Sequence, residues 1–294
     1  MDDVLLYAAF GGDPTRAPLT SLDDFTIQYN LAIGGILLNP ALKGVVANYP
    51  DLFAMPHFTS VPWNVIVFAE EDEPIITATN TAYAAYNGGL DATLAAGYPG
   101  LTDEEVEKRK IQFSVGPNGI VIEDETLTDL SAIGLPSIRQ ATASDLIPLS
   151  AGAVLGTEEI EGDPRTTWGV GKPLTDQYAL IPSEIAEIST RLSEFNTVIK
   201  SVADANAERI AFADVNLAMK NLITAQAGIA NGITFTPNIN PPTGIYSEEG
   251  LHPNSRGYAF IANVFIDAIN AKFGANVPKA NLAGYSATGL PINP

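Results

Sequence analysis

Glu249 and His252 stand three residues apart in the segment EEGLHPNSRG, directly ahead of a stretch with helical apolar spacing. A carboxylate at that spacing can accept the imidazole Nδ1–H, which fixes the tautomer and leaves Nε2 free to take a proton. It also stabilises the imidazolium that forms when the ring accepts the proton. The pair predicts the base half of a hydrolase triad, whose third member would be a serine. The plainer alternative is a solvent-facing histidine close to the start of a helix.

Other hydroxyl and imidazole side chains bear on the missing third member. Ser60, in TSVPWN after a strand-like run, is the candidate nucleophile. We expect Ser247 to hydrogen-bond within its loop and Ser255 to cap the helix that follows. His57, the other histidine in the chain, is interpreted as a packed or exposed ring rather than a second base. A water molecule activated directly by His252 is the alternative to a serine, without covalent catalysis.

The composition is that of an acidic globular protein. Hydrophobic residues make up 46%, and 34 acidic against 15 basic residues give a formal charge of −19. That charge repels phosphate backbones and anionic lipid, so we expect neither nucleic acid nor a membrane surface as a partner. The absence of cysteine excludes disulfides, thiolate catalysis and cysteine-ligated zinc. No apolar run approaches the roughly 20 residues of a membrane span.

We also predict no cofactor and no metal. The acidic run over 70–73 lacks the glycine and histidine spacing of a metal loop and is interpreted as a solvated loop. GVGK at 169–172 resembles a phosphate loop only superficially, because proline follows it where a serine or threonine is required.

Periodicity predicts alternating helices and strands towards both ends of the chain, after an opening MDDVLLYA that reads as strand-like. Helices are expected over 21–38, over 183–206 with Ser183 as the cap, over LAMKNLITAQAGI, and after 254 with Tyr258 on the apolar face; strands are expected over 43–52 and 208–216. Such units predict a parallel sheet flanked by helices, with functional loops at the carboxyl ends of its strands.

The middle of the chain has a different character. A short helix is predicted from Thr102, where TDEE can form a capping box, and a hairpin over 111–124 turns at residues 117–119. We interpret 66–175 as an insertion or cap with local β structure. The prediction for the whole chain, 1–294, is therefore a single α/β domain with its core in 1–65 and 176–294.

The segment EGLHPNSRGYAFIANVFIDAINAKFG (249–274) closely resembles the last conserved block of the SGNH (GDSL) hydrolases, serine esterases and lipases with a flavodoxin-like fold. The match includes Gly250, His252, Pro253, Gly257 and Tyr258. KGVVANYPDL resembles the family's fourth strand, ISTRLSEFN its penultimate helix, and SIRQATASDLIPLSAGAVLG the inserted region of a bacterial subgroup. The resemblance covers most of the chain. It departs at Glu249, where the family has an aspartate.

The resemblance implies a three-layer α/β/α flavodoxin-like sandwich with a parallel sheet, with His252 as general base and Glu249 as its orienting carboxylate. The family's nucleophile lies in a G-D-S-[LY] motif, which this sequence lacks. MDDVLLYA resembles the end of the family's third block and places Asp2 at the oxyanion position, where a carboxylate would repel the developing negative charge. We therefore predict an N-terminally truncated member of this fold.

The predicted function is hydrolysis of short-chain carboxylic esters, with the small-molecule ester as substrate. The alternative is a catalytically impaired remnant with only a ligand-binding or structural role. Loss of the first two strands would leave a sheet edge unpaired, so a homo-oligomer covering that edge is expected. Full-length members of the family are often exported, but this sequence shows no signal peptide pattern, and the localisation is left unassigned.

Overall fold

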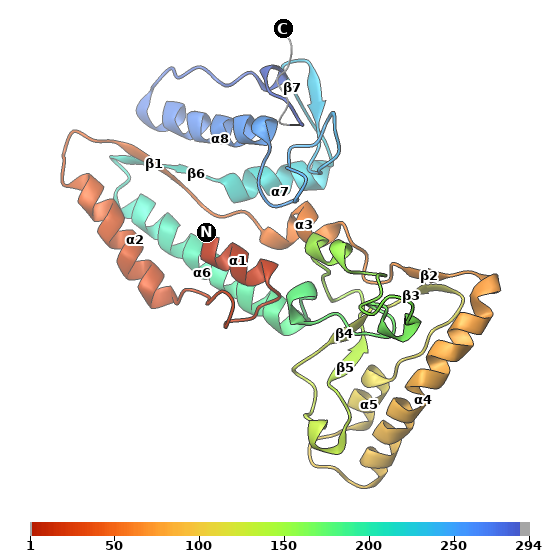
Figure 1. The fold of residues 1–294 in the computed structure, drawn as a ribbon. Helices are drawn as coiled ribbons and strands as arrows, with labels where there is room; N and C mark the ends of the chain where they lie inside the picture. The colour runs from red at the N-terminus through yellow and green to blue at the C-terminus, as the bar shows by residue number, and fades with distance from the viewer. Residues whose placement is uncertain (1, 289–294) are drawn as a thin grey trace. The chain divides into compact units, whose positions relative to one another are not determined.

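The computed structural model describes residues 2–288, apart from the side chains of Asp2 and Asp3, and these residues form a mixed α/β protein (Figure 1). The chain divides into two compact units. Unit 1 comprises Met1–Tyr7, Ala17–Thr59 and Ile185–Pro294, and unit 2 comprises Ala8–Arg16 and Ser60–Glu184. The predicted insertion, 66–175, falls wholly within unit 2. That this unit interrupts a single larger domain stays a prediction.

Unit 1 contains the elements that surround the predicted chemistry. They are α2 (Leu22–Leu37), β1 (Gly44–Ala47), the 3-10 turn Leu52–Ala54, α3 (Pro56–Thr59), nearly all of α6 (Pro182–Ala205), β6 (Ile210–Ala213), α7 (Val215–Ala225), the hairpin strands β7 (Gly228–Ala230) and β8 (Ile233–Phe235), α8 (Ser255–Phe273) and the 3-10 turn Leu282–Gly284.

Strands β1 and β6 form a small parallel sheet, in which Gly44 pairs with Ile210 and Ala47 with Ala213. Figure 1 shows α8 on one side of this pair and α2 with α6 on the other. Polar residues end both strands: Asn48 follows β1, Asp214 follows β6, and the Asn48 amide donates to the Asp214 carboxylate over 2.8 Å. The predicted parallel pairing is confirmed, although both strands are shorter than expected.

Helix α6 carries the predicted apolar stripe. Its buried members are Ile188, Leu192, Phe195, Ile199 and Val202. The predicted cap at Ser183 is wrong, because the helix begins at Pro182 and Ser183 lies inside its first turn. The carboxylate of Glu184 instead accepts the Ile181 N–H over 2.8 Å, the reciprocal bond of a capping box.

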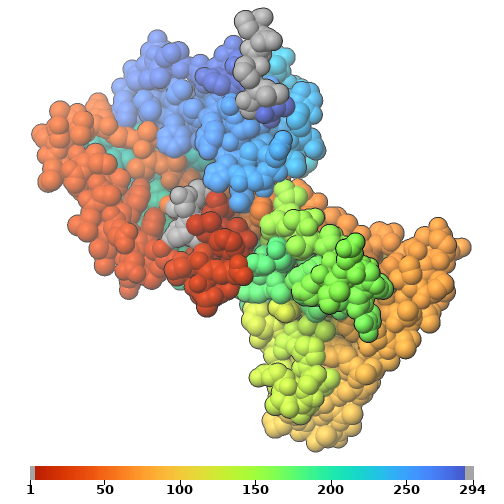
Figure 2. Space-filling model, viewed as in Figure 1, coloured from red at the N-terminus to blue at the C-terminus, as the bar shows by residue number. Residues whose placement is uncertain are grey.

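Helix α2 begins as predicted, with Ser21 Oγ accepting the Asp24 N–H, and the Phe25 ring stacks 3.9 Å from that of Phe195. No residue of α2, which is described over its whole length, is buried. Ile27 and Leu31 are 58% and 70% exposed, and Figure 2 shows this segment on the surface. The helix therefore packs with one edge and leaves apolar side chains in solvent.

Helix α8 differs from its prediction in its cap residue and in the exposure of Tyr258. Its cap is Asn254, whose side chain accepts the Gly257 N–H, so the cap predicted at Ser255 is wrong. Tyr258, predicted on the apolar face, is 55% exposed. Gly257 explains the rotation: a Cβ there would lie 2.1 Å from the Ile245 carbonyl oxygen, so the helix turns this bare position towards the protein.

The opening residues form helix α1 (Asp2–Ala9) rather than a strand. Val4 and Tyr7, three residues apart and both buried, lie on one helical face, and this spacing outweighs the β-branched start. Asp2 begins the helix, but its side chain lies outside the described residues, so its oxyanion role stays a prediction.

Unit 2 is built from short strands and two helices. They are β2 (Ile66–Phe68), α4 (Glu73–Ala95), α5 (Asp103–Arg109), β3 (Gly116–Asn118), β4 (Val121–Glu123) and β5 (Ile138–Gln140), with 3-10 turns at Glu70–Asp72, Ser131–Ile133, Leu149–Ala153, Pro164–Thr166 and Asp176–Tyr178. Strand β2 pairs antiparallel with β3, and β4 with β5. Helix α5 begins as predicted, because Thr102 Oγ1 accepts the Glu105 N–H.

Two expectations for unit 2 were wrong. Pro117 and Asn118 lie in β3 instead of a hairpin turn, because the Asn118 amide closes the preceding turn through two bonds to the Ser114 backbone, each 2.8 Å. The acidic run over 70–73 is a 3-10 turn leading into α4, not a loop. Acidic residues and Pro74 suit a helix start, and the buried Tyr83 and Leu90 hold α4 in place.

Within the described residues, no helix combines the length and apolar character needed to cross a bilayer.

A buried ion network crosses unit 2. Arg139 is 1% exposed, and its guanidinium donates to both oxygens of Asp145 over 2.7 and 2.6 Å and to Asp124 over 2.5 Å. Lys108 also reaches Asp124 over 3.1 Å. A buried guanidinium is tolerated only when its donors are paired, so this unit depends on the two aspartates for its integrity.

We predict that Asp145→Ala lowers the free energy of unfolding of unit 2 by about 3–5 kcal/mol, because it leaves the Arg139 charge buried with half of its partners. Asp163→Ala is the matched control, since Asp163 pairs with the exposed Arg165, and it should change stability little. Urea unfolding followed by circular dichroism measures both. Equal losses in the two variants would contradict the assigned role of the network.

Candidate functional site

The loop between β8 and α8 carries the Glu249–His252 pair on a closed turn. The Ser247 N–H donates to the His252 carbonyl over 2.8 Å, and the Gly250 N–H donates to the Ser247 carbonyl over 3.0 Å. Gly250 has φ +76°, the left-handed region that favours glycine. Because the turn is closed by its own backbone, the residues at its ends are held close together.

Glu249 and His252 meet as the sequence predicted. The Nδ1 atom of His252 hydrogen-bonds with Oε1 of Glu249. The same oxygen accepts the His252 backbone N–H over 3.2 Å and the Ser247 hydroxyl over 3.3 Å. Partial burial opposes ionisation of Glu249, but the hydrogen bonds from His252 outweigh it and lower the pKa of this carboxyl. The carboxylate is therefore kept charged and aimed at the ring.

The other ring nitrogen of His252 is open. The side chain is 55% exposed, and Nε2 makes no hydrogen bond with any residue that the structure describes. With a carboxylate on Nδ1, the neutral ring carries its proton there and presents the Nε2 lone pair to solvent. The geometry can therefore accept a proton from a molecule that approaches the loop.

None of the three serines considered from the sequence is shown to hydrogen-bond with Nε2 of His252 among the described residues. Ser247 hydrogen-bonds within the loop, as expected, to the His252 carbonyl over 2.9 Å and to Glu249. Ser255 is the first residue of α8 and is exposed. Ser60 directly follows α3, is exposed and belongs to unit 2, whereas His252 belongs to unit 1. Its role as nucleophile stays a prediction.

His57, in α3, is a packed ring, one of the two alternatives that the sequence left open. It is only 6% exposed, and its Nδ1 atom lies 2.8 Å from the Glu249 carbonyl oxygen. Burial lowers the pKa of the imidazole. The sequence did not predict that His57 would contact the loop that carries His252.

A cavity of about 770 Å³ lies elsewhere in unit 1, where the two parallel strands end. Asn48, Asp51, Asp214 and Asn216 line it, together with polar side chains along α6 and α7. These four residues follow β1 and β6, at the strand ends where the sequence predicts functional loops. Neither Glu249 nor His252 lines this cavity, so the open imidazole and the cavity are separate features of the unit.

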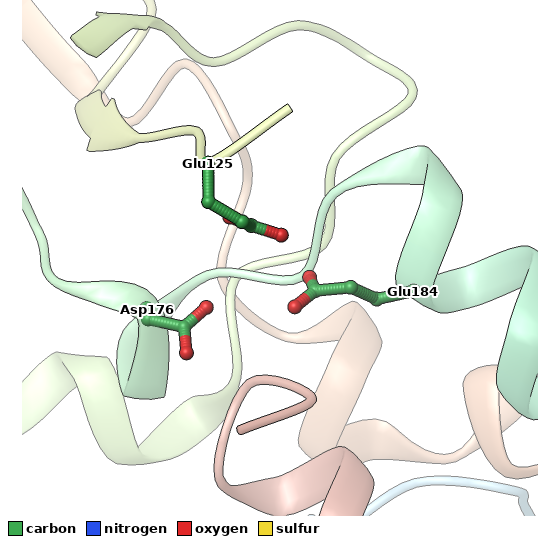
Figure 3. Close-up of side chains that lie close together, drawn as sticks. All are labelled: Glu125, Asp176 and Glu184. Atoms are coloured by element: carbon green, nitrogen blue, oxygen red, sulfur yellow. The ribbon is translucent and has the colours of Figure 1, made fainter. Parts of the chain in front are cut away.

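Unit 2 holds a second group of titratable side chains, shown in Figure 3. Glu125, Asp176 and Glu184 point towards one another, and each offers a carboxylate oxygen within 4.8 Å of the others. They are the group of described residues whose ligand atoms could together hold a metal ion. Carboxylate oxygens suit a hard divalent cation, but exposed and half-buried acidic groups are common without one.

Burial decides the charge of this group. Burial, and then the charge of Glu125, raise the pKa of Asp176 to about 6. Burial raises the pKa of Glu184 to about 9, against the opposing effect of the Ile181 N–H. The surrounding acidic groups are Asp13, Glu123, Glu125 and Asp124, the last already paired with Arg139 and Lys108. Glu184 is thus neutral at pH 7.

Sequence reasoning missed this cluster because its members come from three separate segments. The one local signal was Glu184 in the first turn after Pro182, the position at which a glutamate completes a capping box. Nothing in the spacing of Glu125 and Asp176 connects them to it.

Comparisons with protein-family models, with curated proteins and with solved structures give no match. The SGNH resemblance of the C-terminal segment therefore remains a prediction from the sequence.

We predict that unit 2 becomes less stable as the pH rises from about 5 to about 9. The ordinary pKa values are 3.8 for Asp176 and 4.5 for Glu184, so both folded-state values are raised. A raised pKa means that the fold is stable with the neutral group and loses stability when the group ionises. The stabilisation is complete when the pH is below the ordinary pKa, and it is lost when the pH rises above the folded-state pKa. The loss should therefore pass through about 6 for Asp176 and about 9 for Glu184.

Glu184→Gln should flatten the upper part of this dependence, because the amide is neutral and its oxygen can still accept the Ile181 N–H. Glu158→Gln is the control: Glu158 also accepts a backbone N–H, from Gly162, but it is exposed. Thermal unfolding midpoints over the pH range measure the effect. A midpoint profile that Glu184→Gln leaves unchanged would show that this carboxyl does not set the dependence.

Proposed function

We propose that the protein hydrolyses short-chain carboxylic esters and that His252 is its general base, oriented by Glu249. The observation that carries the proposal is the bond between Nδ1 and the Glu249 carboxylate on a ring whose Nε2 faces solvent. The resemblance of 249–274 to the SGNH hydrolases supports the reaction class. It also supports the three-layer sandwich as the proposed fold, beyond the parallel pair already described.

In the proposed reaction an O–H group attacks the ester carbonyl carbon while Nε2 of His252 takes its proton. Glu249 stabilises the imidazolium. The imidazolium returns the proton to the leaving alkoxide oxygen as the bond between that oxygen and the carbonyl carbon breaks. The attacking group is either a serine hydroxyl, for which Ser60 is the candidate, or water. A serine would form an acyl-enzyme that water then hydrolyses, whereas direct attack by water needs no intermediate.

A ligand-binding protein without turnover is the second candidate. Two observations favour it: Nε2 of His252 contacts no described hydroxyl, and the 770 Å³ cavity at the strand ends has the size of a small-molecule site. An oxyanion position at Asp2 would also disfavour turnover, because its carboxylate repels the negative charge that develops on the carbonyl oxygen.

We predict that His252→Ala lowers kcat for para-nitrophenyl butyrate by about 10²–10⁴-fold, the usual contribution of a general base. Glu249→Gln should give a smaller loss, because without the carboxylate the ring still adopts the Nδ1–H tautomer, whose Nε2 can accept a proton, part of the time. Glu248→Gln is the matched control, an exposed glutamate in the same loop whose loss should leave kcat unchanged. Turnover that is equal in the wild type and His252→Ala would remove His252 from the mechanism.

Labelling with a fluorophosphonate distinguishes the possible nucleophiles. A label on Ser60 supports the acyl-enzyme route, and ester turnover without a label on any serine supports direct attack by water. If the purified protein neither turns over esters nor takes the label, the ligand-binding candidate replaces the hydrolase.

We also propose that a second copy of the chain covers the open edge of β1. Among the described strands only β6 pairs with β1, and the exposed Leu31 of α2 adds an apolar surface in the same unit. Self-association should strengthen with salt, because two chains of charge −19 repel one another at low ionic strength.

Sedimentation equilibrium should find a dimer that Leu31→Lys weakens, whereas Ile160→Lys, a control in unit 2 at a residue that is 58% exposed, should not. A monomer at all salt and protein concentrations would contradict the proposal.

A further inference from the structure

His57 holds the loop of the candidate site by two hydrogen bonds. Its ring nitrogen Nδ1 lies 2.8 Å from the carbonyl oxygen of Glu249, and its backbone N–H donates to the carbonyl of Gly250 over 3.2 Å. Two consecutive carbonyls of the loop are thus bound by one residue that lies 192 positions away in sequence.

The partner of Nδ1 defines the state of the His57 ring. A carbonyl oxygen only accepts, so Nδ1 must carry the proton. Nε2 is buried and has no hydrogen-bond partner among the described residues, so a proton there would be a buried charge without an acceptor. Burial lowers the pKa of this histidine, which agrees with a ring that stays neutral. The ring is therefore a fixed donor to the loop.

The backbone contact is close enough to leave no freedom at Gly250. A Cβ on Gly250 would lie 2.5 Å from the backbone nitrogen of His57, and the φ of Gly250 is +76°. The Phe58 ring also packs edge-on against the His57 ring, with 4.9 Å between the ring centroids. The loop is therefore seated against α3 at its midpoint, between Glu249 and His252.

We propose that His57 is a positioning residue for the candidate site: by binding the carbonyls of Glu249 and Gly250, it places the Glu249 carboxylate against Nδ1 of His252. Its two hydrogen bonds go to backbone carbonyls of the loop and not to Nε2 of His252. The inference rests on the proposed function only for its catalytic consequence, because the positioning itself concerns the free protein.

The direct readout is the tautomer of His252, measured from the ring ¹⁵N shifts at a pH of about 9, above the ordinary histidine pKa of about 6.5. Glu249→Gln sets the scale, since it removes the carboxylate and should convert a mainly Nδ1–H ring into a mixture. His57→Leu removes the donor but keeps an apolar side chain, and we expect it to shift the His252 tautomer in the same direction. His57→Asn retains an N–H close to the Nδ1 position and should restore the wild-type tautomer.

Ile199→Val controls for general loss of stability in unit 1, because it shortens a buried side chain of α6 that does not belong to the loop. It should leave the tautomer unchanged. If His57→Leu does not fold, Gly250→Ala carries the test, since its methyl group displaces the loop from an intact His57. A His252 tautomer that stays at its wild-type value in the folded variant would overturn the proposal. An equal shift in His57→Leu and His57→Asn would also overturn it, because packing rather than the donated hydrogen bond would then hold the loop.

Ester turnover separates this inference from the proposed function. If the protein is a hydrolase, His57→Leu should lower kcat at least 10-fold with KM nearly unchanged, and His57→Asn should recover it. If no form of the protein turns over esters, but the tautomer shifts as expected, the hydrolase proposal fails and the positioning role stands.

Discussion

Glu249 binds both histidines of the chain, each with a different part of the residue. Its carbonyl oxygen accepts from the buried ring of His57, and its carboxylate accepts from the exposed ring of His252. The first bond fixes the backbone, and the second fixes a tautomer. Because a carboxylate on a free loop would sample many directions, the buried contact gives the exposed one its geometry. The proposed chemistry depends on this division between a structural and a reactive imidazole.

The elements around the loop complete this support. Asn254 caps α8 and donates to the carbonyls of Gly244 and Tyr246, over 2.9 and 3.1 Å, which fixes the chain on the far side of His252. Arg256, in the first turn of α8, donates to the Tyr285 carbonyl over 3.1 Å. The loop is thus bound at α3, at the helix cap and by the segment after α8. Movement of Nε2 would therefore come from rotation of the His252 side chain and not from the backbone of the loop.

The parallel sheet of unit 1 is small, and within the described residues one edge of β1 is open. Among the described strands only β6 pairs with β1, and the Phe25 ring of α2 stacks on Phe195. Unit 2, by contrast, contains a buried arginine network and two carboxyl groups, Asp176 and Glu184, whose raised pKa values of about 6 and about 9 make its stability depend on pH. The buried arginine network and the candidate chemistry therefore lie in different units of the chain.

Local patterns predicted the features that three or four residues decide. The Glu249–His252 bond, the Thr102 cap and the apolar stripe of α6 are of this kind. Contacts between distant segments were not predictable: the bond between His57 and Glu249 and the meeting of Glu184 with Asp176 depend on the tertiary fold. Small residues and glycines obscured α4, and burial of one face made α1 a helix where its composition favoured a strand.

The most direct measurement of the central claim is the ring ¹⁵N spectrum of the unmodified protein, in which two histidines give two sets of signals. The account predicts that both neutral rings carry their proton on Nδ1, His57 because of the Glu249 carbonyl and His252 because of the Glu249 carboxylate. A histidine without such a partner is free to carry the proton on either nitrogen. A His252 ring protonated mainly on Nε2 would contradict the account.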